Sequence, residues 1–212
     1  MNCKNISHTS SSPFTCGSFE NVDFCNTRLE RLDISEATFH SCSFYNKDRA
    51  VGCLFTGCKI RNARFTDCDL SMCSFSFADL FGAEFIDCRL IGTSFENASF
   101  AEQLRGNSFF CSGKIENSNL SNACLAGLLL QNCSLRGNRW YETDIEKTDF
   151  SGADLSDGEF LGICWTDAVF TGCDLRGAVL QGLDIRNVNL SGVRMDAWQV
   201  THLVSALGVT VT

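Results

Sequence analysis

Fourteen cysteines are the most reactive side chains of this 212-residue chain, and their spacing decides what they can do. Cysteines can form disulfides or bind zinc, and zinc sites usually hold two cysteines separated by a few residues. No Cys-x-x-Cys pair occurs in the sequence. We expect reduced thiols that pack as small apolar residues, no metal and no cofactor. Eight of them lie two residues before a large apolar residue: Cys42, Cys53, Cys58, Cys68, Cys73, Cys88, Cys133 and Cys173.

The three histidines offer no catalytic group. His8 lies near the N-terminus, His40 follows a phenylalanine and His202 lies in the terminal segment. None has a nucleophile or a ligand partner at a recognisable spacing, and no glycine-rich phosphate loop occurs. The sequence therefore predicts that the protein is not an enzyme. A metal-binding, cysteine-rich protein is a weaker alternative, which zinc analysis under reducing conditions would decide.

Acidic side chains are concentrated in one block. Between Glu142 and Asp184 there are ten acidic residues and only Lys147 and Arg176 as basic ones, so this block carries the whole net charge of −8. A solubilising face and a surface for a partner that holds phosphates both fit this pattern. Direct nucleic-acid binding is disfavoured, because it needs a basic patch. The acidic residues are Glu142, Asp144, Glu146, Asp149, Asp154, Asp157, Glu159, Asp167, Asp174 and Asp184.

A five-residue repeat must position all of these side chains. Bulky apolar residues occupy nearly every multiple of five from Phe55 to Met195, with a lapse at Arg105, and Phe14 to Phe44 keep the period one step out of phase. Neither the helix period of ~3.6 residues nor the strand period of two produces this pattern, so it predicts a repeat array. One large and one small inward residue per repeat fit a narrow tube whose coils stack about 4.8 Å apart.

Phenylalanine indicates the cross-section of this tube. Between residues 55 and 95 it falls on every tenth residue, with Ile or Leu between. If four repeats form one coil, two opposite walls carry Phe ladders, with Phe55, Phe75 and Phe95 in one and Phe65 over Phe85 in the other. Beyond Trp140 the alternation blurs.

Two interruptions break the array. One adds six residues around 45–52 and changes the phase, and the other covers 101–112, although Phe110 keeps the phase and Ser108–Ser112 could belong to the next coil. Insertions in a solenoid project from its surface and often bind partners, but they are also tolerated without a function. The candidate partner-binding residues are Tyr45, Asn46, Lys47, Asp48, Arg49, Glu102, Gln103, Leu104, Arg105, Phe109, Phe110, Cys111 and Ser112.

The C-terminal residues abandon the repeat. Asp196 can cap a helix over Ala197–Leu207, and Val209–Thr212 alternate like a strand. This segment either caps the tube or forms a twofold dimer contact, which a final apolar strand favours because it needs a partner. Candidate dimer-interface residues are Trp198, Val200, Leu203, Val204, Leu207, Val209 and Val211.

The expected organisation is an N-terminal tail or cap (1–13), a repeat domain (14–195) and a C-terminal helix–strand module (196–212). No apolar run approaches the ~20 residues that cross a bilayer, so no membrane contact is expected. Met1–Pro13 contain one lysine and no apolar block, so no secretory signal is expected either. These features favour a cytoplasmic protein.

The repeat resembles the pentapeptide-repeat family, whose motif is a small residue, a polar residue, Leu or Phe, and two variable residues. Ala153-Asp154-Leu155-Ser156-Asp157 and Ala78-Asp79-Leu80-Phe81-Gly82 match this motif, and the resemblance covers about residues 14–195. It implies an all-β fold, a right-handed quadrilateral β-helix with four repeats per turn.

Within that family the chain is similar to the Qnr quinolone-resistance proteins in its length, its two loops, its C-terminal module and the run Phe109-Phe110-Cys111-Ser112. The resemblance implies a homodimer, joined through the C-terminal modules, that imitates duplex DNA. It also implies binding to DNA gyrase, with topoisomerase IV as a second target, and protection from fluoroquinolones through the loops. The alternative is a pentapeptide-repeat scaffold, or an immunity protein against another toxin, without that protection.

Overall fold

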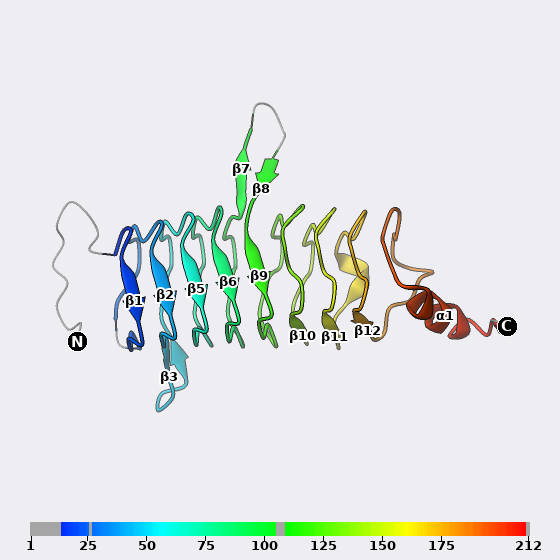
Figure 1. The fold of residues 1–212 in the computed structure, drawn as a ribbon, viewed down its shortest axis with the longest axis horizontal. Coiled ribbons are helices and arrows are strands. Elements are labelled where there is room, and N and C mark those ends of the chain that lie inside the picture. The colour runs from blue at the N-terminus through cyan, green and yellow to red at the C-terminus, as the bar shows by residue number, and fades with distance from the viewer. Residues whose placement is uncertain (1–13, 26, 105–108, 211–212) are drawn as a thin grey trace.

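The chain forms a rod of stacked coils with the N-terminal coils at one end and a helix at the other (Figure 1). A computed structural model describes residues 14–25, 27–104 and 109–210. The expected N-terminal tail, residues 1–13, lies outside the described residues, as do Arg105, Val211 and Thr212. The rod is a right-handed quadrilateral β-helix, as the sequence predicts.

Short parallel strands mark two walls of the rod. One sheet contains β1 (Ser18–Glu20), β2 (Thr38–His40), β5 (Arg64–Thr66), β6 (Glu84–Ile86) and β9 (Lys114–Glu116). The other contains β10 (Arg139–Tyr141), β11 (Glu159–Leu161) and β12 (Val179–Leu180). We call the four walls A to D in the order in which the chain passes through them, so the first sheet lies in wall A and the second in wall B.

The bridges between coils establish four repeats per coil. Parallel bridges join residues 20 apart, such as Asp79↔Ser99 and Asn119↔Arg139. Twenty residues contain four five-residue repeats, so each coil has four walls and each wall contributes one large inward side chain. These inward side chains form one continuous buried core along the rod.

The Phe ladders lie where the sequence predicts them. In wall C, Phe55 stacks on Phe75 with ring centroids 4.6 Å apart, and Phe75 stacks on Phe95 at 5.2 Å. In the opposite wall A, Phe65 stacks on Phe85 at 5.0 Å. Between these phenylalanines the inward residues of walls B and D are Leu or Ile. Each of these coils therefore has an aromatic residue in two opposite walls and an aliphatic residue in the other two.

The blurred alternation beyond Trp140 is a change of walls. Trp140 stacks on Phe160 at 5.4 Å in wall B, and Phe150 stacks on Phe170 at 5.4 Å in wall D. The bridges Arg89↔Asn119 and Asn119↔Arg139 place Trp140 in the wall that holds Leu90 and Leu120. The aromatic ladders therefore move from walls A and C to walls B and D. Both arrangements fill the tube with aromatic rings on two opposite walls.

Cysteines and threonines at the small inward positions also donate hydrogen bonds. Cys53 Sγ donates to the carbonyl of Phe24 at 3.1 Å, Thr93 Oγ1 to that of Leu70 at 2.8 Å, and Cys173 Sγ to that of Phe150 at 2.9 Å. Thr143 and Thr148 make the same bond. The eight predicted packing cysteines are free and buried, as expected, and the thiols of seven of them also donate to backbone carbonyls. Burial raises the pKa of Cys53, Cys133 and Cys173 to about 12.

The corners between walls need left-handed backbone. Gly, Asn and Asp usually occupy these positions, because they tolerate a positive φ. Phe77 and Met72 are exceptions, with φ of 59° and 56° and with 65% and 51% of the residue exposed. Because these side chains are mostly exposed, burial of their apolar surface contributes little to the stability of the fold.

The C-terminal module differs in part from the prediction. Helix α1 (Ala197–Ser205) is present, and a capping box joins Asp196 and Gln199. The Gln199 side chain is buried and donates to the carbonyls of Leu175 and Ala178 at 2.7 and 2.8 Å, which fastens the helix to the last coil. Val209 and Thr210 form no strand, contrary to the prediction for Val209–Thr212, of which Val211 and Thr212 lie outside the described residues. In the described ranges, no helix has the length and hydropathy of a membrane span.

Candidate functional site

The first interruption is a β-hairpin at the corner between walls B and C. Hairpin 1 pairs β3 (Tyr45–Asn46) with β4 (Val51–Gly52) in antiparallel register. Asn46 Oδ1 accepts a hydrogen bond from the backbone N–H of Arg49 at 3.1 Å, which shapes the turn. The tip residues Lys47, Asp48 and Arg49 are exposed. The hairpin therefore offers both signs of charge to a partner.

Hairpin 1 lies close to the coils on both sides. A Cβ on Gly52 would lie 2.3 Å from the backbone of Met72 and Cys73, so only glycine fits this approach. On the other side, a polar groove of about 460 Å³ separates the hairpin from the first coils. Its lining includes Asp23, Ser43 and Tyr45.

The second interruption is a longer hairpin at the opposite corner, between walls D and A. Hairpin 2 pairs β7 (Ala101–Gln103) with β8 (Phe109–Cys111), and Glu102 lies opposite Phe110. The backbone N–H of Ser112 donates to the carbonyl of Phe100 at 3.0 Å and closes the base. Leu104 and Phe109 are 53% and 46% exposed. Figure 1 shows β3 and the pair β7–β8 on opposite sides of the rod.

The phase of the repeat suggested that Phe110 points inward, but the structure places it outside the inward array. Its residue is 55% exposed and lies on the hairpin, so Phe109–Cys111 do not belong to the next coil. Bridges across this hairpin join residues 30 apart, such as Arg89↔Asn119, instead of 20. The difference of ten is a multiple of five, so the insertion preserves the phase of the repeat and Phe110 falls on it by coincidence.

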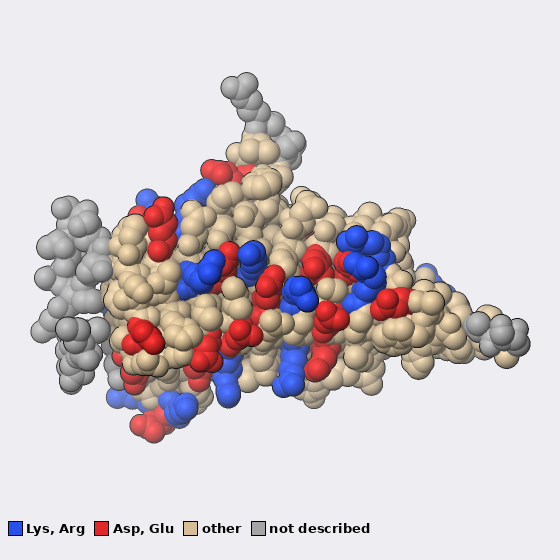
Figure 2. Space-filling model, viewed as in Figure 1, with Lys and Arg blue, Asp and Glu red and all other residues tan. Residues whose placement is uncertain are grey.

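The acidic block is spread around the rod and partly neutralised by arginines. Five of its ten residues form ion pairs, which are Glu146–Lys147, Asp157–Arg136, Glu159–Arg139, Asp174–Arg176 with Arg194, and Asp184–Arg186. Four of these arginines lie outside the block in sequence, so the local count overestimates the charge. On the face shown in Figure 2, acidic and basic side chains lie side by side along the rod.

The other acidic residues divide into corner residues and exposed ones. Asp144, Asp149 and Asp154 accept hydrogen bonds from the backbone N–H of Glu146, Ser151 and Ser156 at 3.0, 2.9 and 3.0 Å, so they shape corners, and Asp144 is exposed as well. Three exposed carboxylates take no part in the ion pairs found among the described residues: Glu142, Asp144 and Asp167.

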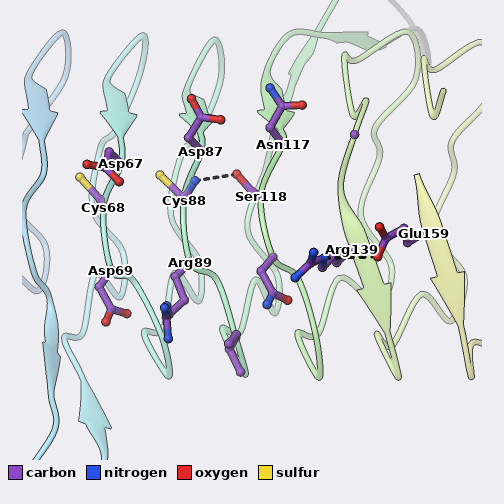
Figure 3. A pocket seen from close by; sticks show the side chains of 13 residues that line it. Asp67, Cys68, Asp69, Asp87, Cys88, Arg89, Asn117, Ser118, Arg139 and Glu159 are labelled. Carbon is purple, nitrogen blue, oxygen red and sulfur yellow. Dashed lines mark hydrogen bonds and ion pairs between the residues drawn. The ribbon is translucent and has the colours of Figure 1, made fainter. Parts of the chain in front are cut away.

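A shallow polar groove follows the corner between walls A and B. Its volume is about 660 Å³, and Asp67, Asp87 and Asn117 occupy equivalent corners of successive coils along it (Figure 3). Arg89 lies in the groove too, and Arg139 pairs with Glu159 at 3.3 Å at its far end. Because both signs of charge line this groove, it selects neither an anion nor a cation.

The C-terminal candidates divide into a buried and an exposed set. Leu203 is only 8% exposed and packs on its own last coil, on the same side of α1 as Gln199, so it is a core residue of the single chain. Val204 is half-buried. Trp198, Val200, Leu207 and Val209 are 58%, 46%, 41% and 52% exposed. A mostly apolar groove of about 640 Å³ lies between α1 and β12 beside Trp198, whereas Val211 lies outside the described residues.

Two residues missed by the sequence analysis contact hairpin 2. They are Arg61 and Phe81, on outward positions 20 residues apart, and Ala101 follows at the same interval. The available signal was an aromatic residue at an outward position that mostly holds polar or charged residues, although Tyr141 is aromatic at the same position. Over the described ranges, no three His, Cys, Asp or Glu side chains cluster as metal ligands would.

Comparisons with known proteins agree with this architecture. The rod of stacked five-residue repeats defines the class of pentapeptide-repeat proteins, and the family described as pentapeptide repeats matches eight copies over residues 51–85, 78–102, 116–157 and 162–192. Full-length QnrB1, a plasmid-mediated fluoroquinolone resistance protein, superimposes with a TM-score of 0.87 at 38% identity, covering 93% of this chain and 92% of QnrB1. A trypsin-treated variant of QnrB1 gives 0.89 at 37% identity, covering 96% and 95%.

Among curated sequences, QnrB96 of Scandinavium goeteborgense, a quinolone resistance pentapeptide repeat protein, is 38% identical over 130 residues. This match spans 61% of the chain and 61% of that relative. The chain belongs to the Qnr family of pentapeptide-repeat proteins. The scaffold of this family is not an enzyme scaffold.

Proposed function

We propose that this chain binds DNA gyrase, with topoisomerase IV as a second target, and protects it from fluoroquinolones. It acts in the cytoplasm as a homodimer joined through the C-terminal modules and catalyses no reaction. Membership of the Qnr family supports the drug class, because the relatives are named as quinolone or fluoroquinolone resistance proteins.

The observation that carries the proposal is the pair of hairpins on an otherwise regular rod. Both hairpins leave the rod at corners and expose charged or apolar side chains, and parallel bridges of other walls continue across them, as in Asp33↔Lys59 and Arg89↔Asn119. Solenoids commonly bind partners through such insertions. The exposed hairpin residues named above are therefore the proposed contacts with the topoisomerase. Cys111 is not one of them, because it is only 7% exposed and packs in the core of the rod.

The rod itself contributes shape and a moderate negative potential. Glu142, Asp144 and Asp167 are the exposed carboxylates that support imitation of duplex DNA. The arginine pairs of the neighbouring carboxylates weaken this imitation, because they leave little net charge in those places. We therefore assign protection to the hairpins and a lesser, salt-sensitive share of binding to the acidic surface.

A supercoiling assay tests the proposal. Gyrase is held at a ciprofloxacin concentration that halves its activity, and the purified chain is titrated into the reaction. We expect supercoiling to recover towards the drug-free level, and the same titration without drug measures any inhibition by the chain itself. Unchanged inhibition throughout the titration would reject the proposal and favour the alternative, a pentapeptide-repeat scaffold or an immunity protein against another toxin.

A further inference from the structure

Hairpin 2 leaves the rod at the corner after wall D, beside the outward residues Arg61 and Phe81. Arg61, Phe81 and Ala101 follow one another at intervals of 20 residues, so they lie in successive coils just after wall D. The backbone N–H of Asn62 donates to the carbonyl of Phe81 at 3.0 Å, and that of Gly82 donates to the carbonyl of Ser112 at 2.8 Å. The side chains of Arg61 and Phe81 therefore lie beside the point where hairpin 2 leaves the rod.

An aromatic contact joins Phe81 to the hairpin. The ring centroids of Phe81 and Phe110 are 5.9 Å apart, with 52° between the ring planes. The guanidinium carbon of Arg61 lies 4.6 Å from the centroid of Phe81. Phe81 thus lies between a cation and a second aromatic ring, both of which favour a planar aromatic side chain at this position.

Ion pairs join Arg61 to the other strand of the hairpin. Arg61 Nη2 lies 3.3 Å from Glu102 Oε1, and Arg61 Nη1 lies 3.1 Å from Asp79 Oδ2. Asp79 belongs to the rod, so Arg61 links rod and hairpin. Glu102 and Phe110 are direct partners in the β7–β8 ladder. The cross-strand pair Glu102 and Phe110 is therefore contacted from the rod on both strands. Arg61 contacts Glu102, and Phe81 contacts Phe110.

We propose that Arg61 and Phe81 form a platform that holds hairpin 2 in its projecting position, and that both are positioning residues for protection of the topoisomerase. The second part of this inference rests on the proposed function. A two-stranded hairpin is only marginally stable by itself in water. Because the side chains of Arg61 and Phe81 belong to the rod, they give the hairpin a fixed direction in addition to the contacts at its base.

Hydrogen exchange measured by mass spectrometry tests the platform itself. Phe81→Ala and Arg61→Ala should accelerate exchange of the amides in β7 and β8 by roughly tenfold, while the coils keep their protection. Phe77→Ala is the matched control, because it removes the same side chain from the same coil at a corner away from the hairpin. Arg64→Ala is the second control, because Arg64 pairs with Glu84 at 2.7 Å instead. Phe81→Tyr keeps the ring and should restore slow exchange.

Titration of the same variants in the gyrase assay tests the positioning role. We expect Phe81→Ala and Arg61→Ala to need roughly tenfold more protein for half-maximal protection, and Phe77→Ala, Arg64→Ala and Phe81→Tyr to behave as the unchanged chain does. Unchanged exchange in β7 and β8 would overturn the platform. Faster exchange with unchanged protection would overturn the positioning role. If the protein without substitutions gives no protection of gyrase, the proposed function is rejected, and the exchange result still tests the platform by itself.

Discussion

At the scale of single residues, the corners of the rod explain why so many cysteines are present. A thiol at the small position is compact enough for the narrow core and still donates to a carbonyl of the preceding coil, as Cys173 does to Phe150. The sequence predicts that the side chain at this position is small, because Ala, Cys and Thr are common there. It does not predict the donor role, because that depends on a carbonyl 23 residues earlier in the chain.

Raised thiol pKa values predict an alkaline loss of stability. The pKa of Cys173 is about 12 in the folded chain against 9.0 without the fold, so between these pH values the unfolded chain loses a proton that the folded chain keeps. The free energy of unfolding therefore falls as the pH rises, by about 1.4 kcal/mol per pH unit for one such thiol. Cys173→Thr keeps the donor and removes this ionisation.

Urea unfolding at pH 7 and pH 10 measures this difference. We expect the unsubstituted protein to lose about 1.4 kcal/mol more than Cys173→Thr between the two pH values. Thr93 provides the precedent for a hydroxyl at such a position. An equal loss in both proteins would show that Cys173 does not contribute to the alkaline transition.

The exposed corner residue Phe77 predicts a gain of stability on substitution. Its φ of 59° is unfavourable for a bulky side chain, whereas Asn97 occupies the same corner one coil later at 56°. Phe77→Asn should therefore raise the free energy of unfolding by about 1 kcal/mol, which chemical denaturation can measure. A lower unfolding free energy would mean that the Phe77 ring stabilises the fold despite its 65% exposure.

At the scale of elements, the lengths of the two hairpins determine how visible they are in the sequence. Bridges across hairpin 1 span 26 residues, as in Asp33↔Lys59, so its six extra residues shift the phase of the repeat and reveal the insertion. Hairpin 2 adds ten residues and keeps the phase, which is why Phe110 suggested a core position. The platform under hairpin 2 could not be predicted, because it depends on which corners lie side by side.

Register arithmetic predicts which deletions fold. Removal of Asn46–Val51 leaves four residues between Phe44 and Phe55, as in a regular repeat, with Cys53 still at the small position. We expect this variant to unfold cooperatively and to keep its far-ultraviolet circular dichroism. Removal of Asn46–Ala50 is the matched control, because it leaves one residue too many and moves the inward side chains outward. Equal stability of the two variants would contradict the register argument.

At the scale of the whole molecule, the rod ends in an apolar surface that the single chain leaves uncovered. Trp198, Val200, Leu207 and Val209 are each exposed at the C-terminal end, and Trp198 lies beside the apolar groove between α1 and β12. Exposed large apolar side chains beside such a groove commonly mark a protein interface. We expect Trp198→Glu to convert a dimer into a monomer in light scattering after size-exclusion chromatography, without loss of the fold. A variant that stays dimeric would exclude the contact at α1.

The overall architecture could be predicted from the sequence because each five-residue repeat forms one wall of a coil. The inward residues of one wall therefore recur at a fixed interval along the chain. The spacing of Phe75 and Phe95 indicates a ladder, and the bridge Ser74↔Ser94 and the stacked rings place them in one wall. The charge of the rod could not be predicted in the same way. Arg136 and Arg194 lie outside the acidic block in sequence, yet they reach Asp157 and Asp174 in space.

The most direct test of the account compares the intact chain with a variant that lacks hairpin 2. Removal of Glu102–Cys111 takes out ten residues and joins Ala101 to Ser112, which leaves four residues between Phe100 and Ile115. In the gyrase supercoiling assay with ciprofloxacin, we expect this variant to be folded and to give no protection at concentrations at which the intact chain restores supercoiling. Full protection by the folded variant would contradict the account, because the rod without this hairpin would then be sufficient.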